Sequence, residues 1–411
     1  MCGIAGVVNF KCHNLEGIKN SLFHRGPNEQ NFYTHGRVAL VHTRLSIQDI
    51  AHGQQPLHYK NFSIVFNGEI YNHLQLRLKY LKNSIFKTQS DTETLLHLYT
   101  KYKKQMFDML DGMFAFAILD KEANNIILAR DRVGKKPLYI YKNNSSLVFA
   151  SELGGIKATV KNLDINEDSI CSYLRAGFFF KQYTPYSNVI EVEAGHVYTI
   201  EIDSLAFKKE RFFNFKEYFL EKRSQTLDES VDELEYLLDK SVRDRLLSSD
   251  IEVGAFLSGG IDSGLIVAMA SKYQKNLKTF TVKFNGAYDE SSLARLVSQK
   301  YDTEHHEIEI NFNVKNDIEK ILLNYGEPFM DSSAVPSYYV SQEAKKHVSV
   351  ILNGDGADEL FGGYRRYVPA ANNLLTLASY LRPLLKILPV SHNKKSLYSY
   401  FYRLLVMSDK I

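Results

Sequence analysis

Tryptophan is absent from this 411-residue sequence, and cysteine is scarce. The three cysteines, Cys2, Cys12 and Cys171, are an odd number and lack metal-ligand spacing. They indicate neither a disulfide framework nor a zinc site. We expect Cys12 and Cys171 to be buried or half-buried residues without a chemical role.

Long apolar segments and a strong net charge are also missing. No run approaches about 18 consecutive apolar residues, and the N-terminus lacks a basic segment followed by an apolar one. We therefore expect a cytoplasmic protein without membrane association. The formal net charge of +3 is nearly balanced, which gives no electrostatic footprint for nucleic acid and favours small-molecule partners.

The chain is too long for one ordinary hydrophobic core, and two domains are expected. Up to about residue 205, short runs rich in β-branched and aromatic residues are separated by turn residues, which predicts antiparallel sheet. The predicted strands are Arg37–Ser46, Phe62–Phe66, Met113–Leu119, Ile126–Ala129 and Leu147–Ala150. A helix opened by the capping pattern Ser90-Asp91-Thr92-Glu93 interrupts them.

From about residue 226 the pattern changes to alternating helices and strands, after a charged and aromatic linker at Arg211–Gln225. The predicted helices are Thr226–Leu247, Ser263–Tyr273, Glu290–Tyr301 and Val335–Lys346. The predicted strands are Val253–Leu257, Thr279–Phe284, His306–Ile310 and Val348–Leu352. Such alternation predicts a doubly wound parallel sheet with its sites beyond the carboxyl ends of the strands.

Cys2 is the strongest chemical signal in the first half. Removal of Met1 would leave one residue with both a thiol nucleophile and an α-amine that can act as general base near neutral pH. A cysteine at a frayed terminus would have no such role. However, Gly3 to Val8 reads as a buried strand, so the terminus is expected to be fixed.

Other polar residues of the first half suit amide hydrolysis on an amino acid. The Asn67 side chain and the Gly68 N–H can stabilise an oxyanion, while Arg44 can bind an α-carboxylate, and Glu69 and Asp91 an α-ammonium group. Each residue also has a structural interpretation. Asn-Gly pairs form hairpin turns, aspartates cap helices, and arginines form surface ion pairs.

Two loops of the second half follow predicted strands and suit a bound phosphate. Ser258-Gly259-Gly260-Ile261-Asp262-Ser263 offers backbone N–H groups and hydroxyls, and Asp262 would require a cation such as Mg²⁺ beside the phosphates. The loop lacks the Gly-Lys-Ser/Thr of a Walker A motif. The other loop, 354–364, contains the carboxylates Asp355, Asp358 and Glu359.

The first half resembles the class II glutamine amidotransferase domain. The matching motifs are Met-Cys-Gly-Ile-Ala-Gly at 1–6, Arg-Gly-Pro at 25–27, Arg-Leu-Ser-Ile at 44–47, Asn-Gly-Glu-Ile-Tyr-Asn at 67–72 and Ser-Asp-Thr-Glu at 90–93. This resemblance implies that Cys2 is the nucleophile and that Asn67 and Gly68 form the oxyanion hole. It also implies that Arg44, Glu69 and Asp91 hold glutamine together with this pair.

The second half resembles the synthetase domain of glutamine-dependent asparagine synthetases, which cleave ATP between the α and β phosphates. The match rests on 258–263, 327–336 and 354–364. It implies that Asp262 and Asp358 contact Mg²⁺ and that Asp355 stands near the reacting intermediate. The implied ATP-binding residues are Leu257, Ser258, Gly259, Gly260, Asp262, Ser263, Val282, Asn353 and Gly354.

The two resemblances together imply an α+β N-terminal-nucleophile domain of stacked antiparallel sheets (αββα) at residues 2–210. An α/β doubly wound ATP pyrophosphatase domain would follow at 226–411. Asn28 and Asn353 depart from the usual Asp and Ser of this family. Relatives also continue beyond the position of Ile411 with further helices, so the chain is expected to be a competent glutaminase and an impaired synthetase.

The predicted function is glutamine-dependent asparagine synthesis, in which ammonia released at Cys2 displaces AMP from an adenylated aspartate. The expected ligands are glutamine, aspartate, ATP and Mg²⁺, and the protein is a candidate homodimer. One alternative is the same chemistry on another carboxylate, such as a sugar uronic acid. Another is a non-catalytic protein whose second half only binds nucleotide or a partner. A β-lactam-forming relative is disfavoured because cyclisation needs no ammonia and therefore no Cys2.

Overall fold

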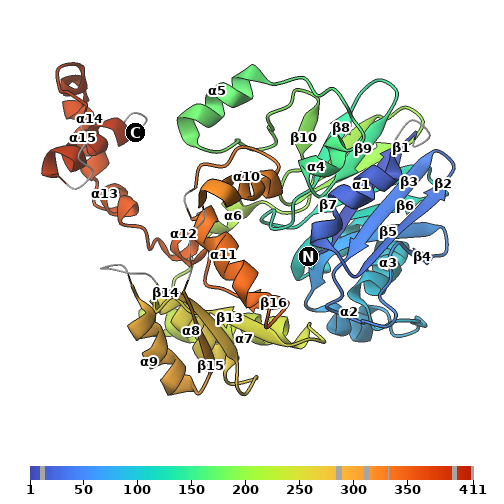
Figure 1. Ribbon diagram of the computed structural model, residues 1–411, viewed down its shortest axis with the longest axis horizontal. Coiled ribbons are helices and arrows are strands. Elements are labelled where there is room, and N and C mark those ends of the chain that lie inside the picture. The colour runs from blue at the N-terminus through green and yellow to red at the C-terminus, as the bar shows by residue number, and fades with distance from the viewer. Residues whose placement is uncertain (10–13, 284–288, 310–313, 332, 391–395, 409–411) are drawn as a thin grey trace.

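The computed structural model describes residues 1–9, 14–283, 289–309, 314–331, 333–390 and 396–408, which form two regions with different kinds of sheet (Figure 1). The first region contains two six-stranded sheets, with strand orders β10-β8-β9-β1-β3-β2 and β12-β11-β7-β6-β5-β4. All of their strand pairs are antiparallel. The strands are β1 (Gly3–Val8), β2 (Glu29–His35), β3 (Val38–Arg44), β4 (Leu57–Tyr59), β5 (Phe62–Ile70), β6 (Gly112–Asp120), β7 (Asn125–Arg130), β8 (Tyr139–Lys142), β9 (Leu147–Ala150), β10 (Val189–Glu191), β11 (His196–Glu201) and β12 (Phe207–Arg211).

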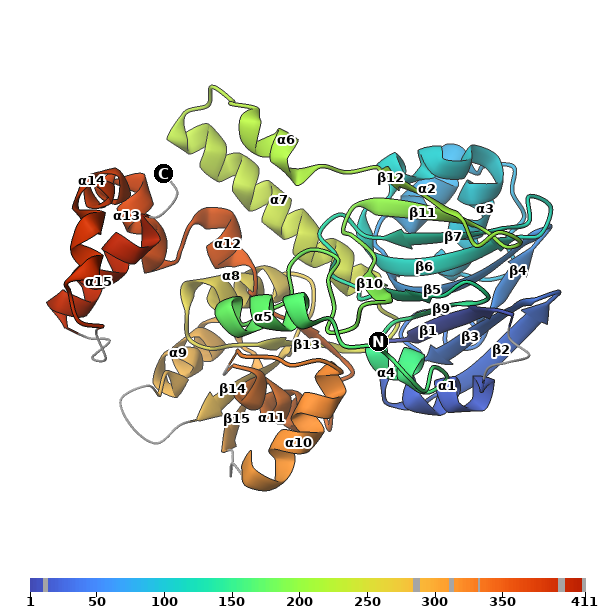
Figure 2. The same cartoon turned by 90° about the horizontal axis from the view of Figure 1, so that it is seen from above.

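Helices cover the outer faces of both sheets, which gives four αββα layers (Figure 2). Successive side chains of a strand point to opposite faces, so Ile4 of β1 packs between the sheets while Ala5 packs outward. The outer helices are α1 (Leu15–Ser21), α2 (His73–Tyr80), α3 (Asp91–Tyr102) and α4 (Leu153–Lys157). The structure therefore confirms the predicted fold of this region.

The second region contains a parallel four-stranded sheet in the order β15-β14-β13-β16. Its strands are β13 (Val253–Phe256), β14 (Lys278–Lys283), β15 (Glu304–Glu309) and β16 (Val350–Leu352). Its helices are α7 (Leu227–Leu247), α8 (Ile261–Ala270), α9 (Ser291–Tyr301), α10 (Val314–Tyr325) and α11 (Ala334–Ala344). Side chains of α7, α8 and α9 pack with Ala255, and those of α11 pack with Phe280 on the other side, so the sheet is doubly wound as predicted.

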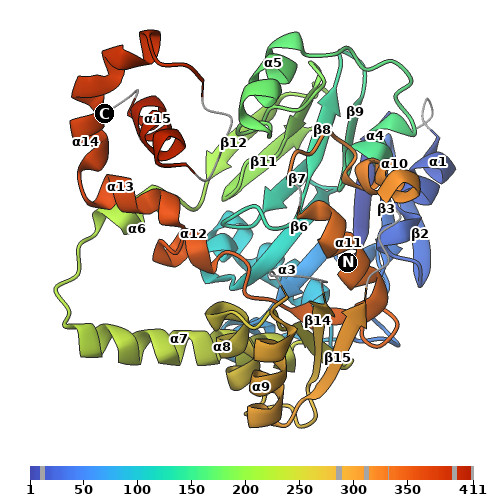
Figure 3. The ribbon, with the colours of Figure 1, turned by 60° about the vertical axis from the view of Figure 1, so that its left-hand side comes forward.

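Shorter elements lie outside these two cores. The remaining α-helices are α5 (Glu167–Ala176), α6 (Phe215–Leu220), α12 (Ala357–Phe361), α13 (Val368–Ala371), α14 (Leu374–Leu381) and α15 (Leu397–Met407). Figure 3 shows α13, α14 and α15 gathered together, and Figures 1 and 2 show this group apart from the sheets. In the part of the chain that the structure describes, no helix has the length and apolarity that crossing a membrane requires.

Several local predictions were wrong. Asn67 and Gly68 lie inside β5, paired with β6, and not after the strand or in a hairpin turn. Helix α8 begins at Ile261, two residues earlier than predicted. The helices that were not predicted are α1, α2, α4, α5, α6, α10, α12, α13, α14 and α15. Cys171 is exposed on α5, not buried, whereas Cys12 lies outside the described residues.

Candidate active sites

Strand β1 fixes the position of Cys2 at the edge of a pocket. The Gly3 N–H donates to Thr43 Oγ1 at 3.1 Å, and the Ile4 N–H donates to Ser151 Oγ at 2.9 Å. Arg25 Nε donates to the Cys2 carbonyl at 3.0 Å. These bonds hold the backbone of residues 2–4 against β3, against the residue after β9 and against the segment before β2.

The surroundings of Cys2 disfavour charged groups. Desolvation raises the pKa of the Cys2 thiol and lowers the pKa of the neighbouring Met1 amine to about 5. A thiol in this environment needs a base to lose its proton. The same burial would favour the unprotonated form of the α-amine that removal of Met1 leaves on Cys2, which is the state that a general base requires.

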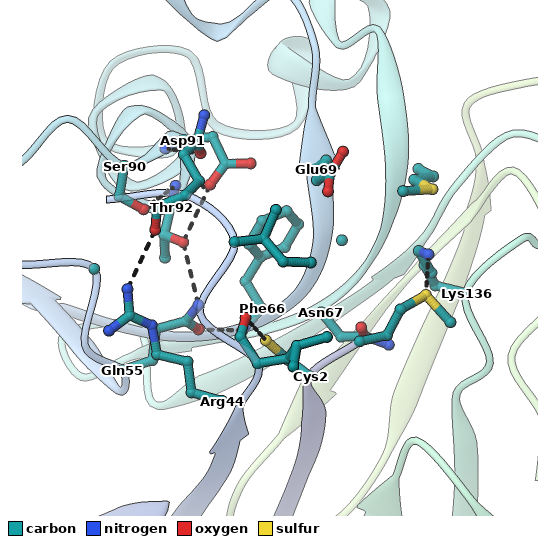
Figure 4. Close-up of a pocket in the computed structure, with 17 residues that line it drawn as sticks. Cys2, Arg44, Gln55, Phe66, Asn67, Glu69, Ser90, Asp91, Thr92 and Lys136 are labelled. Atoms are coloured by element: carbon teal, nitrogen blue, oxygen red, sulfur yellow. Dashed lines mark hydrogen bonds between the residues drawn. The ribbon is translucent and has the colours of Figure 1, made fainter. Parts of the chain in front are cut away.

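Cys2, Asn67 and Gly68 line the same pocket, which we call the Cys2 pocket (Figure 4). The Asn67 side chain is fully buried, yet neither its Oδ1 nor its Nδ2 has a partner among the described residues. An unpaired buried amide is costly unless a ligand completes it. A Cβ on Gly68 would lie 2.1 Å from the Met113 carbonyl oxygen, so the close approach of β6 requires glycine there.

Two buried carboxylates lie in the wall of the Cys2 pocket. Asp91 begins α3, and its Oδ2 accepts the Ile70 N–H at 2.9 Å. Desolvation, with a contribution from the nearby Glu69, raises the pKa of Asp91 to about 7. Desolvation also raises the pKa of Glu69, although Lys136 and a hydrogen bond from Ser248 oppose this rise. Together the two carboxylates form an anionic corner that suits an ammonium group.

Arg44 ends β3 and also lines the Cys2 pocket, but most of its donors already have partners. Its Nη1 donates to Glu29 Oε1 at 2.7 Å and to the Ile50 carbonyl at 3.1 Å. Its Nη2 donates to the carbonyls of Gln48 and Asp49 at 3.2 and 2.7 Å. Arg44 therefore shapes the loop at 45–50. A substrate carboxylate bound there would share the positive charge of Arg44 with Glu29.

Sequence reasoning missed three polar residues of this pocket, Gln48, Gln55 and Lys136. Gln55 accepts the Phe66 N–H at 2.6 Å and donates to Thr92 at 3.2 Å, which joins β5 to α3. Lys136 is 2 % exposed, contacts Met1 Sδ, and has its pKa lowered to about 8 by desolvation. No local pattern marks these residues because their partners come from distant strands and helices.

A second pocket lies beyond the carboxyl ends of the parallel strands, and we call it the strand-end pocket. Most of the residues predicted to bind ATP line it, with Gly259 and Gly260 as exceptions. The lining residues from that prediction are Leu257, Ser258, Asp262, Ser263, Val282, Asn353 and Gly354. Asp355 and Asp358 line the pocket as well.

The loop at 258–263, which we call the glycine-serine loop, is closed by hydrogen bonds between its own residues. Ser263 Oγ accepts the Ser258 N–H at 3.1 Å and lies 3.0 Å from Ser258 Oγ. Gly259 has φ +84°, and a Cβ there would lie 2.9 Å from the Glu290 carbonyl oxygen. Gly260 caps α8 without a side-chain hydrogen bond, which leaves the first N–H groups of this helix available to an anion.

The loop after β16 meets the glycine-serine loop. A Cβ on Gly354 would lie 3.0 Å from Asp262 Cβ, and Asn353 Nδ2 donates to Asp355 Oδ2 at 2.8 Å. The described residues contain no group of three or more His, Cys, Asp or Glu side chains placed to hold a metal ion. Asp262 and Asp358 both line the strand-end pocket, where two carboxylates could share a hard cation with phosphate oxygens.

Both halves of the chain match models of known protein families. A family model described as "Glutamine amidotransferase domain" matches residues 1–213, and one described as "Asparagine synthase" matches residues 233–408.

Named relatives match nearly the whole chain. A protein of Methanocaldococcus jannaschii, "Putative asparagine synthetase [glutamine-hydrolyzing] 2", is 34% identical over 90% of this chain and 76% of its own length. "Asparagine synthetase [glutamine-hydrolyzing] 1" of Bacillus subtilis is 37% identical over 89% of this chain and 59% of its own. "Asparagine synthetase [glutamine-hydrolyzing] 2" of Arabidopsis thaliana is 32% identical over 90% and 62%. The chain thus spans about three-fifths of the length of the last two.

Proposed function

The chain belongs to the family of glutamine-hydrolysing asparagine synthetases, and on that premise we propose that it transfers the amide nitrogen of glutamine to aspartate. The observation that carries the proposal is the buried, unpaired Asn67 amide in the Cys2 pocket. Among these amide atoms Nδ2 is a donor without a partner, in the same pocket as the Cys2 nucleophile, and such a donor is what an oxyanion hole requires.

We propose that glutamine binds with its α-ammonium group against Glu69 and Asp91 and its α-carboxylate near Arg44. The α-amine of the mature Cys2 takes the thiol proton, and Sγ attacks the side-chain amide carbon. Asn67 Nδ2 and the Gly68 N–H stabilise the oxyanion. Ammonia leaves with the transferred proton, and water then hydrolyses the thioester to glutamate and free Cys2.

We propose that the strand-end pocket binds ATP and aspartate. Leu257, Val282, Asn353 and Gly354 line the adenosine end, while the N–H groups and hydroxyls at 258–263 hold the phosphates. The aspartate side-chain carboxylate attacks the α-phosphorus, pyrophosphate leaves, and ammonia then displaces AMP. Mg²⁺ held by Asp262 and Asp358 would neutralise charge on the leaving pyrophosphate.

A cavity lined by residues of both regions adjoins the two pockets, and we propose it as the route of ammonia. Met1 and Leu45 line both the Cys2 pocket and this cavity. Phe256 and Ser341 line both this cavity and the strand-end pocket. The shared lining residues support the proposal that nitrogen passes inside the protein from a glutaminase domain at 2–210 to a synthetase domain at 226–411.

Product analysis tests this function. The chain is incubated with glutamine, ATP, Mg²⁺ and, separately, aspartate and a panel of other carboxylic acids that includes sugar uronic acids. We expect glutamate, AMP, pyrophosphate and an amide product only in the incubation that contains aspartate, and we expect that product to be asparagine. Formation of a different amide would assign another acceptor, and ADP in place of AMP would contradict the proposed cleavage of ATP.

A further inference from the structure

The turn Ser248–Asp250, which follows α7, belongs structurally to the second region. Leu238, Val242 and Leu246 of α7 pack in the core on one face of the parallel sheet. Figure 2 shows α7 running from α6 toward the strands of the first region. The turn at the end of this helix therefore comes from one region and meets the other.

Ser248 contacts a carboxylate of the Cys2 pocket directly. Its Oγ donates to Glu69 Oε2 at 3.2 Å, and both residues are buried. The Arg245 carbonyl, 3.0 Å away, is a second acceptor for the same proton. An ionised Glu69 is the stronger acceptor, since hydrogen bonds to charged groups are stronger than neutral ones.

Arg245, one turn earlier on α7, strengthens this contact. Its guanidinium lies 4.3 Å from the centre of the Tyr71 ring, two residues after Glu69. Its positive charge also favours the ionised form of Glu69 and so opposes the desolvation that raises the pKa of this carboxyl. The end of α7 thus contacts the end of β5 and favours the ionised form of Glu69.

Asp250 holds the loop at 47–49 by two bonds. Its Oδ2 accepts the Asp49 N–H at 2.6 Å, and its own N–H donates to the Ile47 carbonyl at 3.0 Å. The residue between these anchors is Gln48, whose Oε1 accepts the Asp91 N–H at 3.1 Å. The pair of bonds therefore fixes the residue that contacts the start of α3.

Gln48 also links the two ends of the amino-acid site. Its backbone carbonyl accepts from Arg44 Nη2 at 3.2 Å, while its side chain holds Asp91 and contacts His73 at 2.9 Å. Gln48 Nε2 makes the contact with His73 Nε2, and because an amide nitrogen only donates, the histidine nitrogen is the acceptor. A shift of Gln48 would therefore displace the binding groups for the carboxylate and for the ammonium together.

We propose that the Ser248–Asp250 turn is a positioning element of the glutamine site, so that the synthetase region sets the affinity of the glutaminase region for its substrate. This inference rests on the proposed function. Neither Ser248 nor Asp250 touches the reacting atoms, so substitution of either residue should change KM for glutamine far more than kcat.

The test compares Asp250→Ala, Asp250→Asn and Ser248→Ala with the matched control Ser230→Ala. Ser230 is exposed near the start of α7, at the other end of the helix, and its hydroxyl donates to the Thr226 carbonyl at 2.9 Å. We expect Asp250→Ala to raise KM for glutamine about tenfold and Ser248→Ala about threefold, as loss of hydrogen bonds involving charged groups does. Asp250→Asn keeps a carbonyl acceptor for the Asp49 N–H and should restore nearly normal KM, and Ser230→Ala should change nothing.

A labelling measurement separates this inference from the proposed function. A diazo ketone analogue of glutamine and iodoacetamide both alkylate Cys2, but only the analogue carries α-amino and α-carboxylate groups. We expect Asp250→Ala to slow alkylation by the analogue about tenfold, in line with its KM, and to leave alkylation by iodoacetamide unchanged. Equal slowing of both reagents, or unchanged KM and analogue labelling in Asp250→Ala and Ser248→Ala, would overturn the inference. A wild-type chain that binds the analogue but releases no glutamate from glutamine would overturn the proposed function alone.

Discussion

The Cys2 pocket and the strand-end pocket differ in how the fold supports their charged groups. Glu69 and Asp91 are at most 9 % exposed and are held by strands, a helix start and a turn from the other region. Asp262, in the first turn of α8, and Asp355, in the turn after β16, are by contrast exposed. The first pocket is organised before substrate arrives, whereas the second is lined by exposed carboxylates that could share a cation with phosphate oxygens.

This difference predicts that single substitutions separate the two activities. The largest effect is expected for Cys2→Ala, which removes the only thiol of the Cys2 pocket among the described residues. Glutamine hydrolysis should fall at least about a thousandfold, while asparagine synthesis from added ammonia should persist. Rates of glutamate and asparagine formation measure both. The control Cys171→Ala removes an exposed thiol and should change neither rate.

The next largest effect is expected for Asp262→Asn in the strand-end pocket. Loss of one carboxylate leaves metal and phosphate charge poorly compensated, which costs on the order of several kcal/mol in the transition state. AMP formation should fall about a thousandfold and glutaminase activity should remain. Glu252→Gln, which removes a surface partner of Lys278, serves as control. Full AMP formation by Asp262→Asn would show that the pocket does not use this carboxylate.

The two pockets also differ in how far the sequence predicts them. The loops at 258–263 and 354–364 follow strands whose type is visible in the residue pattern, so their place at one edge of the sheet was predictable. The Asn67-Gly68 pair was misplaced because a local Asn-Gly signal favours a turn, whereas pairing with β6 keeps it in a strand. Gln48, Lys136 and Ser248 were missed because their roles depend on partners that are close only in the folded chain.

A smaller effect is expected for Asn67→Ala, which removes one oxyanion donor and leaves Gly68 in place. Such a loss costs about a hundredfold in kcat in comparable sites. KM for glutamine should change little because Asn67 is not one of the residues proposed to bind the α-ammonium and α-carboxylate groups of glutamine. Steady-state hydrolysis measured against Asn31→Ala, a change on the neighbouring sheet, checks this expectation. A kcat within a fewfold of the wild type would contradict the oxyanion role.

The smallest effect is on stability and concerns Asp91. Its pKa in the folded chain is about 7, above the unfolded value of about 3.9, so its contribution to stability is complete below about 3.9 and is lost as pH rises through 7. Asp91→Asn does not ionise and should therefore gain thermal stability relative to the wild type between about pH 5 and pH 8. Melting temperatures across this range measure the gain, and a constant difference between the two proteins would contradict it.

The same titration predicts weaker glutamine binding at low pH. Protonation of Asp91 below about pH 7 removes the negative charge proposed to bind the substrate ammonium group, so KM for glutamine should rise as pH falls. Ammonia-dependent synthesis, measured at a constant concentration of free ammonia, should not follow that KM curve. If ammonia-dependent synthesis and KM for glutamine showed the same dependence on pH, this prediction would be wrong.

The most direct measurement follows nitrogen from one pocket to the other. Glutamine labelled with heavy nitrogen in its side-chain amide is supplied with ATP, Mg²⁺ and aspartate, together with unlabelled ammonium in solution. The account predicts that the side-chain amide of asparagine carries the label in excess of the solution ammonium, with AMP as the nucleotide product. Asparagine that carries only the isotope ratio of the solution, or labelled ammonium without asparagine, would contradict transfer between the two sites.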